Sequence, residues 1–153
     1  MKSDRVQELF AEVPAGPGDV RFRAYFHHFN AGRYYEAHDV LESLWLEQGR
    51  GHPDYAFHKG LIQLAGGFVH LKLHRAHPEH RAHGQRLGPA LRLLEIAARN
   101  LAPYPPVYHG FETGQAQALI SQTVAELRHH PGVNPWRADA LPVLGPARIK
   151  DSP

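Results

Sequence analysis

The stretch YAFHKGLIQLAGGFVHLKLHRA, which spans residues 55–76, decides the fold of this chain. Its hydrophobic residues recur at the spacing of an α-helix rather than alternating as they would in a strand. The residues that share its apolar face are Leu61, Ile62, Ala65, Phe68 and Val69. Asp54 precedes the stretch as a plausible N-cap, and His77-Pro78 follows it as a stop signal. We therefore predict one long helix here.

The same helical period extends on both sides of this stretch, from about Val20 to His130, and no segment shows a convincing strand pattern. The ranges predicted for the other helices are 20–30, 34–48, 79–101 and 113–130. Gly88-Pro89 predicts a kink or break within the third of these, because proline removes a helical hydrogen-bond donor. The predicted fold class is all-α, a compact bundle of about five helices.

Segments rich in proline and glycine separate the ends of the chain from this bundle. We predict an N-terminal extension over residues 1–18, a helical domain over 19–130 and an irregular proline-rich C-terminal arm over 131–153. The arm holds five of the 13 prolines, yet it also carries Trp136 and several aliphatic residues. We therefore expect its segment from Trp136 to about Leu144 to lie in a groove of the same subunit or of a partner, which makes a homodimer one interpretation.

Composition excludes several classes of protein. The chain has 153 residues and no cysteine, which excludes disulfide frameworks, thiolate nucleophiles and cysteine-based metal sites. The longest mostly apolar run, residues 60–71, is too short and too polar to span a bilayer. Acidic residues at positions 4, 8 and 12 interrupt the N-terminus where a signal peptide would be apolar, so we expect a cytoplasmic protein without membrane association.

Histidine is the unusual feature of the composition, with 13 copies against 17 Lys and Arg and 15 Asp and Glu. The net charge of +2 is small, and the arginines are scattered along the chain. Binding to nucleic acid needs a concentrated basic stripe, so we regard a nucleic-acid partner as unlikely.

The helix predicted over residues 34–48 carries a histidine and a carboxylate on its apolar face. His38 and Glu42 are one turn apart, so their side chains are neighbours, and we predict that both point inward. Glu36 lies in the first turn, where a carboxylate is stabilised by the helix dipole.

The long helix carries a second, polar stripe that includes Gln63 and His70 and passes the glycine pair Gly66-Gly67. Adjacent glycines in a helix allow another backbone or a ligand to approach closely. If the two helices pack antiparallel, the polar groups converge into a candidate pocket. The residues of this predicted pocket are Glu36, His38, Glu42, Trp45, Gln63 and His70.

Two interpretations of this convergence remain open. His38, Glu42 and His70 have the composition of a divalent metal site built between helices. The same groups also make a buried hydrogen-bond network that satisfies itself. We expect Trp45, Phe57 and Phe68 to belong to the core. The histidines expected to face solvent are His27, His28, His80, His83, His129 and His130.

Residues 29–45, FNAGRYYEAHDVLESLW, resemble the signature of domain-of-unknown-function family 309, in which a Gly and aromatic residues precede Glu-Ala-His-acid, a Glu and a Trp. Residues 60–65 resemble the Gly-Leu-Ile-Gln block of that family, and residues 101–112 resemble its ending. The chain departs from the pattern at Asp39, where glutamate is usual, and at Lys59, where glutamine is common. The resemblance covers roughly residues 24–128 and implies a small all-helical fold of unestablished activity.

Three functions are therefore carried forward from the sequence. The first is a binding or structural module for a small-molecule or protein ligand. The alternative is a metal-dependent hydrolase or small-molecule enzyme that uses His38, Glu42 and His70, with the metal activating a bound water. A nucleic-acid accessory role has only the isoelectric point near 9.0 in its favour.

Overall fold

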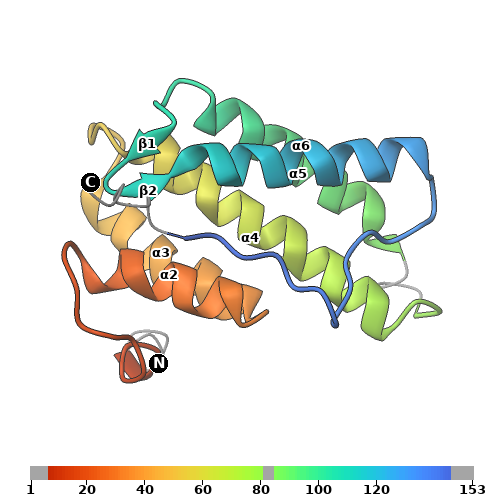
Figure 1. The fold of residues 1–153 in the computed structure, drawn as a ribbon, viewed down its shortest axis with the longest axis horizontal. Helices are drawn as coiled ribbons and strands as arrows, with labels where there is room; N and C mark the ends of the chain where they lie inside the picture. The colour runs from red at the N-terminus through yellow and green to blue at the C-terminus, as the bar shows by residue number, and fades with distance from the viewer. Residues whose placement is uncertain (1–6, 81–84, 146–153) are drawn as a thin grey trace, which may run out of the picture.

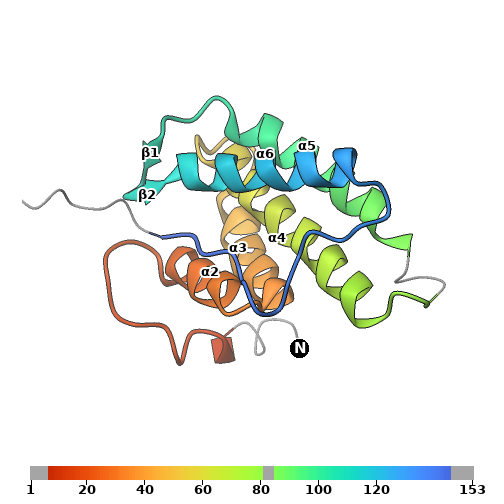
Figure 2. The ribbon, with the colours of Figure 1, turned by 45° about the vertical axis from the view of Figure 1, so that its right-hand side comes forward.

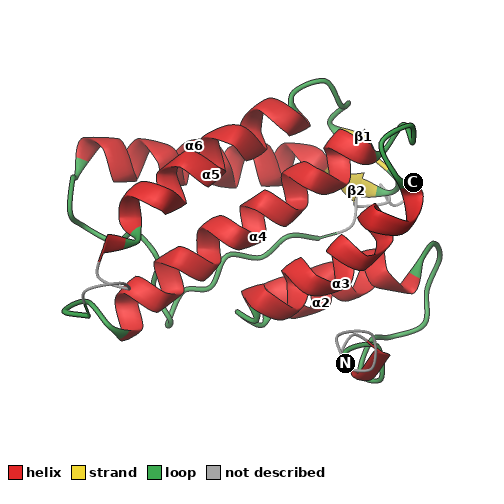
Figure 3. Cartoon of the chain, turned by 180° about the vertical axis from the view of Figure 1, so that it is seen from behind, coloured by secondary structure: helices red, strands yellow, loops and turns green. Residues whose placement is uncertain are grey.

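The computed structural model describes residues 7–80 and 85–145. Its helices are α2 (Val20–Asn30), α3 (Tyr34–Gln48), α4 (Tyr55–Ala76), α5 (Leu87–Leu101) and α6 (Thr113–His129). The long helix α4 lies in the middle, with α3 packed on one side and α5 on the other (Figures 1 and 3). Helix α2 packs on α3 and helix α6 on α5. The predicted all-α bundle is confirmed.

Two glycines of α4 explain how closely α5 approaches it. A Cβ atom on Gly67 would lie 2.8 Å from Cγ of Leu94, and a Cβ atom on Gly60 would lie 2.8 Å from Cγ of Leu101. A Cβ atom does not fit at such distances. The leucine side chains of α5 therefore pack directly on the backbone of α4 at these two glycines. The predicted close helix contact at Gly66-Gly67 is confirmed, with Gly67 as the tighter position.

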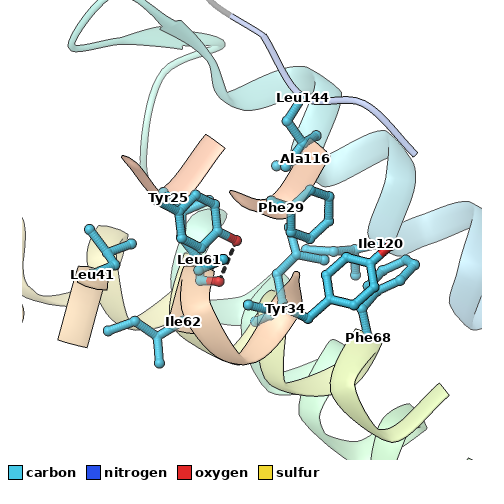
Figure 4. Close-up of a cluster of buried hydrophobic side chains, with 14 of the residues drawn as sticks. Tyr25, Phe29, Tyr34, Leu41, Leu61, Ile62, Phe68, Ala116, Ile120 and Leu144 are labelled. Carbon is cyan, nitrogen blue, oxygen red and sulfur yellow. Dashed lines mark hydrogen bonds between the residues drawn. The ribbon is translucent and has the colours of Figure 1, made fainter. Parts of the chain in front are cut away.

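Aromatic side chains fill the space between α2, α3 and α4 (Figure 4). Tyr25, Phe29 and Tyr34 are almost fully buried, and the ring of Phe29 meets the ring of Phe68 edge to face. The Tyr25 hydroxyl donates a 2.6 Å hydrogen bond to the carbonyl of Leu61, which satisfies the one polar atom of that side chain. Phe57 and Phe68 belong to the core as expected.

The connection between α5 and α6 contains a feature that the sequence analysis missed. Strands β1 (Val107–Tyr108) and β2 (Phe111–Glu112) pair antiparallel, with Tyr108 opposite Phe111. The two residues between them are His109 and Gly110, and both have positive φ angles, of 52° and 70°. Positive φ at both central positions is what the tightest hairpin turns require.

Helix α5 begins later than predicted. We expected a helix from residue 79 with a break at Gly88-Pro89, but the helix starts at Leu87. Pro89 therefore lies in the first turn, where a helix tolerates a residue without an N–H group. Residues 81–84, which include His83, lie outside the described part of the chain.

The C-terminal arm runs across the bundle between α2 and α6 (Figure 2). Trp136 and Leu144 are 7% and 1% exposed, and the Trp136 indole N–H donates a 2.8 Å hydrogen bond to the Tyr34 hydroxyl. Asn30 exchanges two hydrogen bonds with the backbone of Leu144, of 2.7 and 2.8 Å. Trp136 and Leu144 are thus buried against the bundle, whereas residues 137–140 and 143 between them are exposed. Docking of the whole segment, in a groove of the same subunit or of a partner, stays a prediction. Residues 146–153 lie outside the described part.

The N-terminal extension is tied to α2 by a histidine that we expected in solvent. His28 is only 3% exposed, its Nε2 lies 2.9 Å from the carbonyl oxygen of Leu9, and its Nδ1 accepts a hydrogen bond from Arg33. The prediction for His28 was therefore wrong, whereas His80, His129 and His130 are exposed as expected. Among the described residues, no helix is both long and apolar enough to cross a membrane.

Candidate functional site

The structure places the predicted pair His38 and Glu42 at the border of α3 rather than in its interior. Their side chains are 30% and 23% exposed, and His38 Nε2 lies 3.8 Å from Glu42 Oε2. His38 Nδ1 lies closer, at 3.1 Å, to Asp39 Oδ1. The pair is a half-buried contact along one helix.

Gln63 and His70 each have a hydrogen-bond partner on the side of α4 that faces α5. The Gln63 side chain accepts a 2.6 Å hydrogen bond from Asn100 on α5, and His70 Nδ1 accepts one of 2.8 Å from Arg86. Both polar groups are thus engaged between α4 and α5. Burial and the neighbouring Arg86 lower the pKa of His70 below its ordinary value, because both disfavour the protonated ring. The predicted convergence on His38 and Glu42 stays a prediction.

The remaining members of the predicted pocket lie apart from one another on α3. Glu36 is half-buried in the first turn. Trp45 stacks near the Tyr55 ring, 5.0 Å between centroids, and Lys59 Nζ lies 5.7 Å from both rings. Within residues 7–80 and 85–145, no group of three or more His, Asp or Glu is arranged to hold a metal ion.

A different cluster forms where the β-hairpin meets the start of α4. Asp54 immediately precedes α4, but its carboxylate makes no capping bond to the helix. Instead it accepts a 2.5 Å hydrogen bond from the Tyr108 hydroxyl at Oδ1, and its Oδ2 lies 2.7 Å from Nε2 of His109. Burial disfavours the carboxylate, but these two hydrogen bonds outweigh it and lower the pKa of Asp54. The same bond raises the pKa of Tyr108 to about 12.

The strained backbone of His109 helps to place its imidazole beside Asp54. A positive φ costs a residue with a Cβ atom about 1 kcal/mol relative to glycine. Such conformations persist where surrounding contacts hold them, and here the bond to Asp54 is one of those contacts.

His58 lies one turn into α4 and is 2% exposed. Its Nδ1 is 2.9 Å from the side-chain oxygen of Gln48, which can only accept, so Nδ1 carries the proton. Burial lowers the pKa of His58 to about 4, and the attraction of Asp54 offsets this only in part. His58 is therefore neutral near pH 7, and its Nε2 is an acceptor that bonds to no described residue.

Asp54, His58 and His109 line one cavity of about 270 Å³. The other lining residues are Pro17, Gly18, Asp19, Phe22 and Leu44. A second, mainly apolar groove of about 380 Å³ adjoins it, because Pro17, Phe22 and His109 line both. This groove continues past Phe26 and Phe111. Its volume lies within the range of about 300–1,000 Å³ that small-molecule sites occupy.

An arginine fixes the outer wall of the groove. Arg23 on α2 donates hydrogen bonds to the backbone carbonyls of Pro14, Pro17 and Gly18, at 3.4, 3.0 and 2.5 Å. These bonds hold the loop that precedes α2 against the mouth of the two hollows.

Sequence reasoning did not identify this site. Asp54 was interpreted as an N-cap, and neither His58 nor His109 was considered. Two signals were present: the spacing of four residues between Asp54 and His58, and the Tyr-His-Gly sequence at positions 108–110, which suits a tight turn. The contact between positions 54 and 109 depends on tertiary structure.

In the comparison with known proteins, part of the chain matches the model of a family whose description names no activity. No curated protein and no solved structure matches the chain. The family model that does match, over residues 22–81, is described as Domain of unknown function (DUF309). The matched segment includes Phe22, Asp54 and His58 but not His109. This match supports assignment of residues 22–81 to the DUF309 family.

Proposed function

We propose that the protein is a small-molecule-binding module whose ligand occupies the cavity beside His58 and the adjoining groove. The observation that carries the proposal is the buried His58 side chain, which lines the cavity and whose Nε2 bonds to no described residue. The lone pair of Nε2 can accept a hydrogen bond from a ligand group in the cavity.

The combination of a polar end and an apolar groove supports the same proposal. Ligand sites are typically concave and apolar, with a few polar groups that fix orientation. Here Asp54, His58 and His109 lie at one end, and Phe22, Phe26 and Phe111 line the groove that leads away from them. A molecule with one polar end and a short apolar chain matches this arrangement.

Isothermal titration with hexan-1-ol tests the proposal. We expect saturable one-site binding that is weakened at least tenfold in Ala15→Trp, because Ala15 lines the groove and the larger side chain would occupy it. The matched control is Ala138→Trp, an exposed position that lines none of the cavities described above. Absence of saturable binding, or equal weakening by the two variants, would contradict the proposal.

The metal site and the metal-dependent hydrolase based on residues 38, 42 and 70 stay predictions, and fewer observations support them than support the cavity beside His58. His70 accepts a hydrogen bond from Arg86, and His38 lies 3.8 Å from Glu42. A homodimer and a cytoplasmic location also remain proposals, supported only by the sequence arguments.

A further inference from the structure

The polar end of the cavity offers a ligand acceptors instead of donors. Because the side-chain oxygen of Gln48 accepts a hydrogen bond from the Nδ1–H group of His58, the Nε2 atom of the neutral ring presents a lone pair. Asp54 already receives hydrogen bonds from Tyr108 and His109, and its carboxylate carries negative charge at neutral pH. A ligand group that contacts this end must therefore donate.

The charges around the cavity favour a cation over an anion. The carboxylates that line it are those of Asp19 and Asp54, and none of its described lining residues is a lysine or an arginine. The two nearby arginines are engaged elsewhere: Arg21 pairs with Asp19 and Glu47, and Arg23 bonds to loop carbonyls. An anionic head would be desolvated beside the Asp54 carboxylate, with no lysine or arginine among the described lining residues to pair it.

An aromatic ring lies in the wall of the cavity, beside the position that a cation would occupy. Phe22 lines the cavity, and its ring centroid lies 5.9 Å from the His58 ring and 6.4 Å from the His109 ring. The face of an aromatic ring attracts an ammonium group within about 6 Å. Beyond Phe22 the groove is lined by Phe26 and Phe111, which suit methylene groups. Arg23 also lines it, with its guanidinium bonded to loop carbonyls.

We infer that the site takes a small aliphatic primary amine, whose ammonium group bonds to His58 Nε2 and faces Asp54 while its chain lies in the groove. This inference rests on the proposed function and names the ligand class of the same site. It assigns His58 as the hydrogen-bond acceptor, Asp54 as the counter-charge and Phe22 as the shared wall between head and chain.

The test is a titration of the wild-type chain at pH 7.5 with three ligands of equal length: hexylamine, hexan-1-ol and hexanoate. An alkylamine is fully protonated at this pH, since its pKa is about 10 or above. We expect hexylamine to bind at least tenfold more tightly than hexan-1-ol, and hexanoate to bind most weakly. If hexan-1-ol binds and hexylamine binds no more tightly, or if hexanoate binds best, the inference is overturned and the proposed function stands. If none of the three binds saturably, both fall.

Variants then locate the preference on the named residues. In His58→Leu and in Asp54→Asn, each first shown to be folded by its thermal melt, the ratio of hexan-1-ol to hexylamine dissociation constants should fall toward one. His129→Leu, at an exposed histidine, serves as the control and should keep the wild-type ratio. An unchanged ratio in either folded variant would overturn the assignment. The titration of the wild-type chain decides the ligand class even where a variant does not fold.

Discussion

The Tyr108 hydroxyl lies 2.5 Å from Oδ1 of Asp54, and this bond joins the β-hairpin to the start of α4. The hairpin has only two residues in each strand, which is too few to be stable alone. Its position therefore depends on contacts such as this one and the bond between His109 and Asp54. One carboxylate thus holds the hairpin and supplies the charge at the polar end of the cavity.

Removal of that carboxylate should loosen the hairpin. We expect Asp54→Ala to lower the free energy of unfolding by about 1–3 kcal/mol at pH 7, as when a buried hydrogen-bonded group is removed. Because the pKa of Asp54 is lowered in the folded protein, its contribution is present above the unfolded pKa of about 3.9 and is lost as pH falls through the folded value. Urea melts at pH 7, 5, 4 and 3 measure this, with the exposed Asp139→Ala as control. If the loss of unfolding free energy in Asp54→Ala grew toward pH 3, the pKa of Asp54 would be raised in the folded protein and not lowered.

His58 should make stability depend on pH over a second window. Its pKa is about 4 in the folded protein against an ordinary value of 6.5, so the unfolded chain takes up a proton first as pH falls. His58 therefore leaves the free energy of unfolding unchanged above about pH 6.5 and lowers it as the pH falls toward 4, by up to about 3 kcal/mol. The titratable groups that act on His58 are Asp54, His109, His52 and Asp19.

The matching measurement compares urea melts of wild type and His58→Leu between pH 7 and 4. The variant should show a shallower dependence on pH, whereas His129→Leu should follow wild type. Parallel curves for wild type and His58→Leu would mean that His58 titrates normally.

The contact between α4 and α5 should not accept a single methyl group. A Cβ atom at Gly67 would meet Leu94 at 2.8 Å, so we expect Gly67→Ala to cost about 1–3 kcal/mol despite the better helix propensity of alanine. Gly114 in α6 is the matched control, since nothing lies within 4 Å of the position of its Cβ atom. There, alanine should stabilise by up to about 1 kcal/mol. Thermal or urea unfolding of both variants checks the pair, and a gain of stability at Gly67 would refute the close contact.

The C-terminal arm should detach when its anchor is removed. Trp136→Ala takes away a buried ring and its bond to the Tyr34 hydroxyl, and we expect a loss of about 3–5 kcal/mol if the arm stays docked, or less if it dissociates. Trypsin cleavage after Arg137, an exposed residue in the arm, distinguishes these cases. We expect slow cleavage in the native wild type and rapid cleavage in the variant. Equal rates would show that Trp136 does not hold the arm.

Local patterns were sufficient to predict most of the helices. The bounds of α2, α3 and α4 follow from hydrophobic period and end signals, because both are properties of neighbouring residues. Pro89 misled the prediction for α5, since a proline near a helix can mark either a break or a first turn. The hairpin was missed because strands of two residues show no alternation.

The candidate site was beyond reach for a different reason. Helical projection places His38 and Glu42 on one face, but it does not say which neighbour covers that face. Gln63 bonds to Asn100 on α5, and His70 bonds to Arg86, which immediately precedes α5. The bond between Asp54 and His109 spans 55 positions of sequence and exists only once the hairpin folds over α4. Burial of His28 likewise depends on a distant residue, Leu9.

The measurement that tests the central claim most directly is an isotope-filtered NOE experiment on the protein with bound hexan-1-ol. We predict NOEs from the methylene protons of the alcohol to the ring protons of Phe22, Phe26 and Phe111, together with shifted amide signals at His58 and Gly110. NOEs confined to other surfaces, such as the hollow lined by Pro135 and Trp136, would contradict the account, as would the absence of any NOE at saturating alcohol.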